Sequence, residues 1–291
     1  MSDHLDAGAR RLLERSDSER IRYTQVPEMI AYPRASEILS ALQELFDYQP
    51  MHRMPNVLIY GRTNNGKTMI VDHFSKQYPA SDDPDNNNSI VPILSVLAPP
   101  TPHEGQFLDA IIQSLYAPGK FSYSLGQKRK QVLDLLAAVK IRMLVIDEIQ
   151  HVLAGGPVHQ RAFVNSLKIM GSHLRIPLVA AGTEEALNAF RFDAQMANRF
   201  EAFELPRWRI GKDFLRLLAS FERQIPLKQP SYLARTGLAT KILAMSEGTI
   251  GEVAKLLNLA AAVAIRTGQE HIDEHTLDKT RYVPPSSRKM G

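Results

Sequence analysis

An eight-residue segment in the first quarter of the chain has the residue types that bind phosphate groups. Residues 61–68 read Gly-Arg-Thr-Asn-Asn-Gly-Lys-Thr and match the pattern G-x-x-x-x-G-K-[ST]. Glycines let backbone N–H groups wrap closely around an anion, and the lysine neutralises the β- and γ-phosphates. An apolar run, NVLIY, precedes the segment and a helical pattern follows it, which makes a chance glycine-rich turn the poorer interpretation. We predict that ATP is bound by Gly61, Arg62, Thr63, Asn64, Asn65, Gly66, Lys67, Thr68 and Met69.

Two consecutive acids follow a second apolar run. Residues 143–146, Met-Leu-Val-Ile, lead into Asp147 and Glu148, which places both acids at the carboxyl end of a predicted buried strand. Open α/β sheets bind their ligands at that edge. We expect Asp147 to bind Mg²⁺ together with Thr68, and Glu148 to orient and deprotonate the attacking water. Solvated acids also end many strands, so this signal gains its strength from the phosphate-binding segment.

Hydrolysis of ATP also calls for a positive group, because negative charge spreads over the γ-phosphoryl oxygens in the transition state. Three arginines precede or follow the last predicted strand: Arg191, Arg199 and Arg207. We select Arg199, which stands directly before that strand. The alternative is a surface ion pair of Arg199 with Glu201 or Glu204.

The elements that would position these residues alternate along the chain. Strands are predicted at 56–60, 90–97, 142–147, 177–182 and 200–205, with helices at 34–47, 67–78, 104–116, 127–139 and 159–173. This alternation predicts an α/β fold in which a parallel five-stranded sheet is flanked by helices. After Pro206 only helices are expected, at 211–224, 236–246, 249–267 and 273–281.

These patterns predict four parts. Residues 1–25 form an N-terminal arm, 26–208 an α/β ATPase domain, 209–283 a small helical lid domain and 284–291 a flexible tail. The arm mixes arginines with acids. It is either a solvated helix or a segment that docks on a neighbour or partner, and the first interpretation is favoured.

Composition excludes several classes of protein. The 291 residues include no cysteine, which rules out disulfides, thiolate zinc sites and cysteine nucleophiles. No apolar run approaches the roughly 20 residues of a membrane span, and the charged N-terminus has no apolar core typical of a secretory signal. A cytoplasmic location is therefore expected. The net charge of +4 permits binding to nucleic acid without requiring it.

The order of these features resembles that of AAA+ ATPases. Five stretches are more narrowly similar to the TniB family of transposition ATPases, which are relatives of TnsC: YPRASEIL, VLIYGRTNNGKT, MLVIDEIQHVLAG, IPLVAAGTEEA and RFEAFELPRW. The resemblance extends from about residue 20 to about residue 280.

The resemblance implies a function and several site roles. ATP-bound copies would assemble as a ring or helical filament on duplex DNA, recruit a DDE-type transposase with a TniQ-type adaptor, and leave the DNA on hydrolysis. Thr183 would sense the γ-phosphate, Arg199 would reach a neighbour's ATP, and Tyr32, Pro33 and Arg34 would flank the adenine. One departure concerns the lid, where AAA+ proteins often carry an arginine that touches the γ-phosphate. This chain lacks it, and Lys255 is a poor substitute.

DNA binding without sequence preference, which the resemblance implies, needs cations facing phosphates. Lys120, Lys128, Arg129 and Lys130 cluster beside two aromatic residues after the second predicted strand. We predict that this segment contacts DNA, although a solvated loop and helix start would have the same pattern.

Two other functions remain open from the sequence. One is an AAA+ helicase loader or remodelling factor, which shares the fold and the ATP chemistry. The other is a nucleotide-controlled signalling ATPase that binds protein and never DNA.

Overall fold

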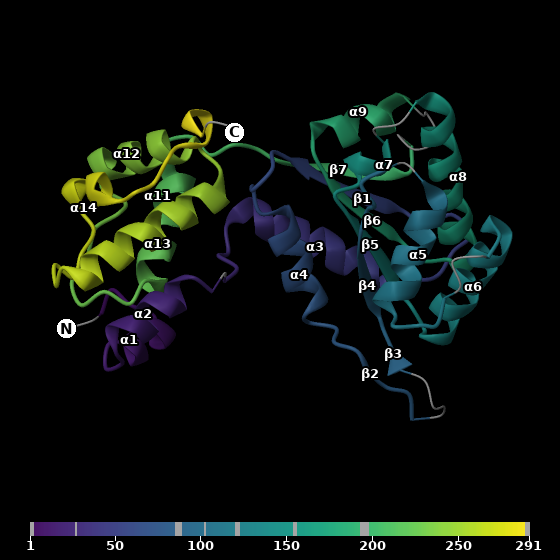
Figure 1. The fold of residues 1–291 in the computed structure, drawn as a ribbon, viewed down its shortest axis with the longest axis horizontal. Coiled ribbons are helices and arrows are strands. Elements are labelled where there is room, and N and C mark those ends of the chain that lie inside the picture. Colours follow the sequence, from purple (N-terminus) through teal and green to yellow (C-terminus); the bar gives the residue numbers. More distant parts are fainter. Residues whose placement is uncertain are drawn as a thin grey trace. The chain divides into compact units, whose positions relative to one another are not determined.

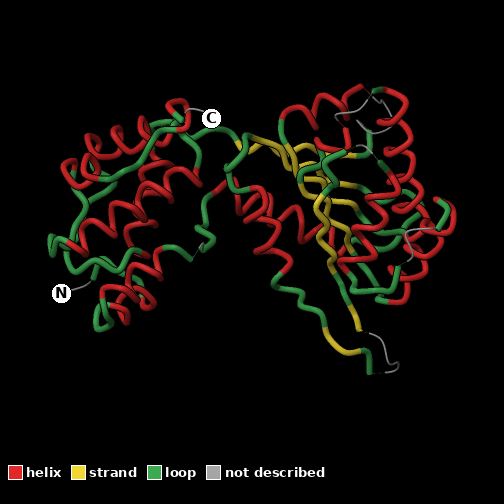
Figure 2. Tube along the Cα trace, viewed as in Figure 1, coloured by secondary structure: helices red, strands yellow, loops and turns green. Residues whose placement is uncertain are grey.

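A computed structural model describes residues 3–26, 28–84, 89–101, 103–119, 123–153, 156–192 and 198–288. The chain divides into two compact units. The α/β unit comprises residues 37–63 and 67–205, and the helical unit comprises residues 1–36, 64–66 and 206–291. The strands belong to the α/β unit, and the described parts of the helical unit contain helices and loops alone (Figure 2).

The α/β unit is built on one parallel sheet of five strands in the order β4-β5-β6-β1-β7. The strands are β1 (Asn56–Gly61), β4 (Ile93–Leu97), β5 (Met143–Asp147), β6 (Leu178–Gly182) and β7 (Phe200–Leu205). The predicted sheet is thus confirmed. The second strand begins later than predicted, because residues 89–90 form β3 (Ser89–Ile90), which pairs antiparallel with β2 (Ser81–Asp82) in a separate two-stranded sheet.

The strand register brings the chemistry-bearing segments to one edge of the large sheet. Asp147 pairs with Leu97 at the ends of β5 and β4. Gly61, the last residue of β1, pairs with Leu205. A Cβ atom at Gly61 would lie 2.6 Å from the Leu205 carbonyl oxygen, so only glycine allows β1 to run this close to β7 where the phosphate-binding loop begins.

Helices cover both faces of the sheet. They are α3 (Pro33–Asp47), α4 (Lys67–Ser75), α5 (Glu104–Ser114), α6 (Leu125–Ala138), α7 (Gln150–Leu153), α8 (Pro157–Leu174) and α9 (Glu184–Phe192). Leu144 and Ile146 of β5 join one large core with residues of α5, α6, α8 and α9. Figure 1 shows α3 and α4 on the other side of the strands. Burial on both faces explains why the inner strands β1, β5 and β6 are almost continuously apolar.

The helical unit contains α1 (Ala7–Leu12), α2 (Asp17–Thr24), α11 (Lys212–Gln224), α12 (Thr236–Ser246), α13 (Ile250–Arg266), α14 (Glu274–Lys279) and the short 3₁₀ helix η1 (Pro285–Ser287). Helix α13 is apolar on most sides and packs against α2, α12 and α14. Within the described residues no single helix is long and apolar enough to cross a membrane; α12 and α13 pass that test only as a pair bent by 114°.

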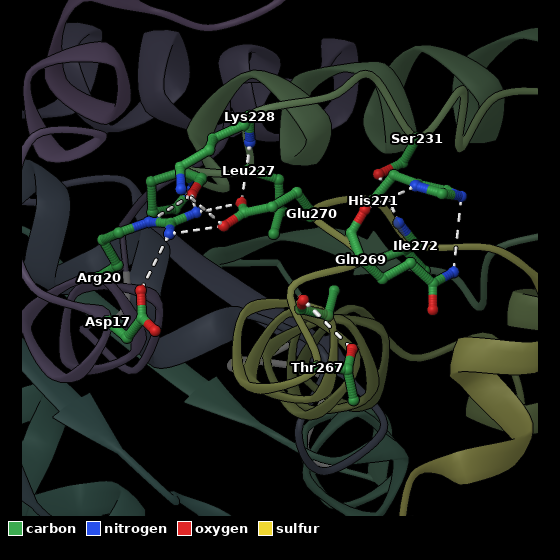
Figure 3. A network of polar contacts seen from close by, with 12 residues as sticks. Asp17, Arg20, Leu227, Lys228, Ser231, Thr267, Gln269, Glu270, His271 and Ile272 are labelled. Carbon is green, nitrogen blue, oxygen red and sulfur yellow. Dashed lines mark hydrogen bonds and ion pairs between the residues drawn. The ribbon is translucent and has the colours of Figure 1, made fainter.

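A buried ion pair ties the N-terminal helices to the C-terminal ones. Arg20 of α2 is 1% exposed, and its guanidinium donates to the Glu270 carboxylate at 2.9 Å and to the Pro226 carbonyl at 2.7 Å (Figure 3). Lys228 lies 3.2 Å from the same carboxylate. Burial raises the pKa of Glu270, but the hydrogen bonds and positive charge from Arg20, together with the hydrogen bonds from Lys228, outweigh burial, so the net shift is downward. Helices α1 and α2, which belong to the arm predicted at residues 1–25, therefore dock on the C-terminal helices of their own chain.

Candidate nucleotide-binding site

Lys67 provides a buried positive charge at the start of α4. Its side chain is 4% exposed, and Nζ donates to the carbonyls of Gly61 at 3.0 Å and Arg62 at 2.9 Å. Burial lowers the pKa of Lys67, while the nearby negative charges of Glu148 and Asp147 oppose that shift. A buried ammonium group of this kind attracts an anion strongly, because little water screens it.

Thr68 and Asp147 meet beside this lysine. The Thr68 hydroxyl donates to Asp147 Oδ2 at 2.6 Å, and Asp147 Oδ1 accepts the backbone N–H of Glu148 at 2.8 Å. Hydroxyl and carboxylate oxygens are the ligand types that Mg²⁺ prefers. The two residues predicted to bind the metal thus lie in direct contact, and their chemistry fits the ion.

Glu148 is half-buried and has a left-handed backbone conformation, with φ of 53°. Its carboxylate accepts a hydrogen bond from the side-chain amide of Gln150. The other end of that amide, Oε1, accepts the backbone N–H of Thr183 at 3.2 Å. The Thr183 hydroxyl itself donates to Glu185. Gln150 thereby joins two predicted site residues. Its sequence position, two residues after Glu148, is the only local signal that points to such a role.

The tip of the phosphate-binding loop belongs to the helical unit. Asn64 has φ of 60°, and its carbonyl accepts the N–H of Gly251 at 3.0 Å. The Asn65 side chain donates to the Pro206 carbonyl at 3.1 Å and accepts the N–H of Ile250 at 3.4 Å. The first turn of α13 is therefore bonded to this tip.

Glu252, also in that first turn, anchors the tip and the end of the chain. It is 5% exposed and accepts hydrogen bonds from Asn64 at 3.0 Å, Tyr282 at 2.8 Å and Arg288 at 2.9 Å. The Arg288 guanidinium, with Tyr282 and Asn64, lowers the pKa of Glu252 to about 2. Residues 284–291 were predicted to form a flexible tail, whereas Arg288 is held in an ion pair here. Lys255, considered as a substitute for the missing lid arginine, is exposed.

Tyr32 lies near the same tip. Its ring is 8% exposed and makes an edge contact with Trp208, with ring centroids 5.0 Å apart. Burial raises the pKa of Tyr32 to about 12. Its hydroxyl would lie 3.8 Å from a Cβ atom placed on Gly66, which has φ of 90°. Arg34 is half-buried on α3. A role for either residue at the adenine stays a prediction.

Arg199 lies at the opposite edge of the sheet from Lys67 and Asp147. It directly precedes β7, and its carbonyl accepts the N–H of Asn56 at the start of β1. Its side chain lines a cleft with Lys168 and Ser172 of α8, and its Nε atom is buried with no hydrogen-bond partner within the described part of the chain. The strands therefore separate Arg199 from the phosphate-binding lysine of its own chain, and a role for Arg199 at a neighbour's ATP stays a prediction.

The predicted DNA-contacting cations are engaged with acids of their own chain. Lys128 contacts Asp109 at 2.6 Å, and Arg129 contacts Glu104 at 2.7 Å. Lys130 contacts Asp134 on the same helix at 2.5 Å, and its side chain is 78% exposed. Lys120 lies outside the described residues. Contact with DNA stays a prediction for these residues, and of the three described cations Lys130 is the most accessible.

Comparison with solved structures defines the class of the fold. The ADP form of the Orc2 protein of Aeropyrum pernix aligns with a TM-score of 0.62 and 16% identity over 94% of this chain and 73% of that chain. Cdc6p of Pyrobaculum aerophilum aligns with a TM-score of 0.61 and 15% identity, over 88% of this chain and 68% of that chain. The A. pernix Orc1 protein in complex with DNA aligns with a TM-score of 0.56 and 14% identity, over 89% of this chain and 68% of that chain. These are AAA+ ATPases, and this chain has the same fold.

The family follows from the sequence itself. The model described as bacterial TniB protein matches residues 20–210, about two thirds of the chain. The chain therefore belongs to the TniB family, as its motifs indicated. No curated protein matches it.

Proposed function

We propose that this protein is a magnesium-dependent ATPase whose nucleotide state controls its assembly on duplex DNA during transposition. The observation that carries the ATPase part is the contact of the Thr68 hydroxyl with Asp147, beside the buried ammonium group of Lys67. A cation and two hard oxygen ligands in this arrangement suit a triphosphate and its metal better than any other common ligand.

Each group has a defined task in this proposal. Lys67 exchanges its two carbonyl acceptors for the β- and γ-phosphate oxygens. Thr68 and Asp147 hold Mg²⁺, which when bound neutralises charge that develops on the phosphates. Glu148 accepts a proton from the attacking water and orients it toward the γ-phosphorus. Thr183, at the end of β6, contacts the γ-phosphate.

The position of Arg199 favours catalysis between copies. Since Arg199 and Lys67 lie at opposite edges of one sheet, Arg199 could complete only the site of a neighbouring chain. An arginine supplied in this way is worth ~10³–10⁵ in rate in other ATPases and GTPases. Assembly would therefore accelerate hydrolysis, which suits a protein that leaves DNA after hydrolysing ATP.

The DNA-related part rests on family membership. The TniB name connects the chain to transposition, and the Orc1 protein that shares its fold was solved in complex with DNA. We propose that the partners are duplex DNA bound without sequence preference, further copies of this chain, a DDE-type transposase and a TniQ-type adaptor. We place the protein in the cytoplasm.

One set of measurements tests both parts. The purified protein is titrated with a fluorescent ATP analogue, its phosphate release is followed with and without duplex DNA, and DNA binding is measured with ATP, with ADP and without nucleotide. The proposal expects ATP-dependent DNA binding and DNA-stimulated turnover. ATP binding without any DNA binding would favour a signalling ATPase. Recruitment of a helicase instead of a transposase in pull-down experiments would favour a helicase loader.

A further inference from the structure

Gln150 connects two groups that the proposed ATPase uses for different purposes. Its Nε2 atom donates to the Glu148 carboxylate, and its Oε1 atom accepts the Thr183 N–H at 3.2 Å. The first group is placed to deprotonate water and the second belongs to the residue placed at the γ-phosphate. All three residues lie in the α/β unit, at the carboxyl edge of β5 and β6.

The chemistry of the partners fixes the direction of this amide. A backbone N–H can only donate and an ionised carboxylate can only accept. The amide oxygen therefore has to face Thr183 and the amide nitrogen has to face Glu148. An ionised glutamate, a leucine or a reversed amide at position 150 could not satisfy both partners.

The backbone around Gln150 also leaves little freedom. The N–H of Ile149 donates to the Ala181 carbonyl of β6 at 3.0 Å. A Cβ atom at Gly182 would lie 2.8 Å from Gln150 Oε1 and 2.8 Å from the Ile149 side chain. The glycine at the end of β6 thus provides the room in which the amide lies, and displacement of that strand end would move the amide.

We propose that Gln150 is a positioning residue, which orients the Glu148 carboxylate according to the place of Thr183. A change at the γ-phosphate that moves the end of β6 would then alter the orientation of the carboxylate that activates water. This inference rests on the proposed ATPase function, because it assigns a control within that same site.

The test compares three substitutions with the wild-type chain. Gln150→Ala removes both bonds and is expected to lower kcat about 10- to 100-fold, since a misplaced catalytic group can cost about 10²-fold. Affinity for ATP should change by less than about threefold, because Lys67 and the loop are untouched. Gln150→Asn keeps the amide but shortens the side chain, and its kcat is expected to lie between those of Gln150→Ala and the wild type.

The pH dependence of activity in Gln150→Glu distinguishes a positioning role of Gln150 from a role in packing alone. Its carboxylate cannot donate to Glu148 when ionised, but its protonated form can. We expect activity relative to wild type to rise as pH falls from 8 toward 6, whereas the alanine variant should show no such recovery. Gln113→Ala, at an exposed position on α5, is the matched control.

The outcomes are distinguishable. If the wild-type chain does not hydrolyse ATP, or if Glu148→Gln hydrolyses it at the normal rate, the proposed function is overturned and this inference with it. An active wild type with an unchanged kcat in Gln150→Ala would overturn the inference alone. Equal losses of kcat, ATP affinity and melting temperature would also overturn it, since they would mean that Gln150 only supports the fold.

Discussion

The two units of the chain place their charged groups in different ways. In the α/β unit, Thr68, Asp147 and Thr183 are brought together by strand ends and by the helix after β1, so local elements determine where they lie. In the helical unit, Arg20 bonds Glu270 across 250 positions, and Asn64 bonds Glu252 across 188. The first set comes together through topology, and the second comes together through individual ion pairs and hydrogen bonds.

This difference indicates what each set contributes. The groups at the sheet edge bond mainly to each other and to loop backbone, and they can exchange those bonds for a ligand. In the helical unit, Arg20, Glu252 and Glu270 are buried and hydrogen-bonded, and removing a partner leaves a buried charge without compensation. Substitutions of the groups at the sheet edge should therefore change the rate of ATP hydrolysis or the affinity for ATP. Substitutions of the buried groups in the helical unit should change the free energy of unfolding.

The largest effect is expected from Glu148→Gln. The amide cannot take a proton from water, so turnover should fall by ~10²–10⁴-fold while ATP affinity and melting temperature stay unchanged. Single-turnover phosphate release and nucleotide titration measure the two effects. Complexes with ATP and DNA should also live longer. Turnover at the wild-type rate would mean that another group activates the water.

Arg20→Met tests the helical side of the comparison. It leaves the Glu270 carboxylate buried without its main partner, which is expected to cost about 3–5 kcal/mol of unfolding free energy. Urea unfolding measures the loss. Arg22→Met, at an exposed position of the same helix, is the control and should cost far less. Equal effects of the two substitutions would show that the ion pair does not hold the unit together.

Lys67→Ala removes the cation at the base of the loop. Charge-assisted hydrogen bonds contribute about 1.5–3 kcal/mol each, so ATP affinity should fall by about 100-fold or more. The fold should persist, as judged by circular dichroism. Lys76→Ala, at an exposed position just beyond α4, should bind ATP normally. Tight ATP binding by the Lys67 variant would contradict the assignment of the loop.

Arg288→Ala should alter the pH dependence of stability. The guanidinium lowers the pKa of Glu252 to about 2, against an ordinary value of 4.5. A lowered carboxyl pKa stabilises the fold above the unfolded-state pKa, and that contribution disappears as pH falls from about 4.5 toward 2. The variant should therefore be less stable than wild type at pH 7, and the difference should shrink near pH 3. A difference that is constant with pH would contradict this explanation.

The smallest effect is expected from Lys130→Ala. If this exposed lysine contacts one DNA phosphate, its loss should weaken binding to all sequences similarly and reduce the slope of log affinity against log salt by about 1. Fluorescence anisotropy at several salt concentrations measures this slope. An unchanged slope would remove Lys130 from the DNA-contacting surface.

The sequence predicted the sheet because its signals are local. Most of the strands are short apolar runs next to helices, and the loop at 61–68 has four fixed positions. The mostly apolar run at 90–97 predicts too early a start for β4, because Pro92 and the pairing of residues 89–90 with β2 interrupt it. The helices after Pro206 were also predicted from their spacing.

The contacts of Gln150 and Arg20 cannot be predicted from the residues next to them in the sequence. Gln150 looks like any polar residue at a helix start until β6 is placed beside β5. Arg20 resembles its exposed neighbours in a segment rich in charges, and its burial depends on a carboxylate near the other end of the chain. Long-range pairs of this kind depend on how distant segments of the chain pack against each other. Composition and hydrophobic periodicity do not reveal that packing.

The buried Arg20 has a practical consequence for anyone who prepares this protein. The region that matches the TniB family begins at residue 20, in the middle of α2. A recombinant fragment trimmed to that boundary would lack α1 and the capped first turn of α2, which keep the guanidinium in place. Such a fragment should precipitate or purify poorly for reasons unrelated to nucleotide or DNA, so residues 1–19 should be kept for expression.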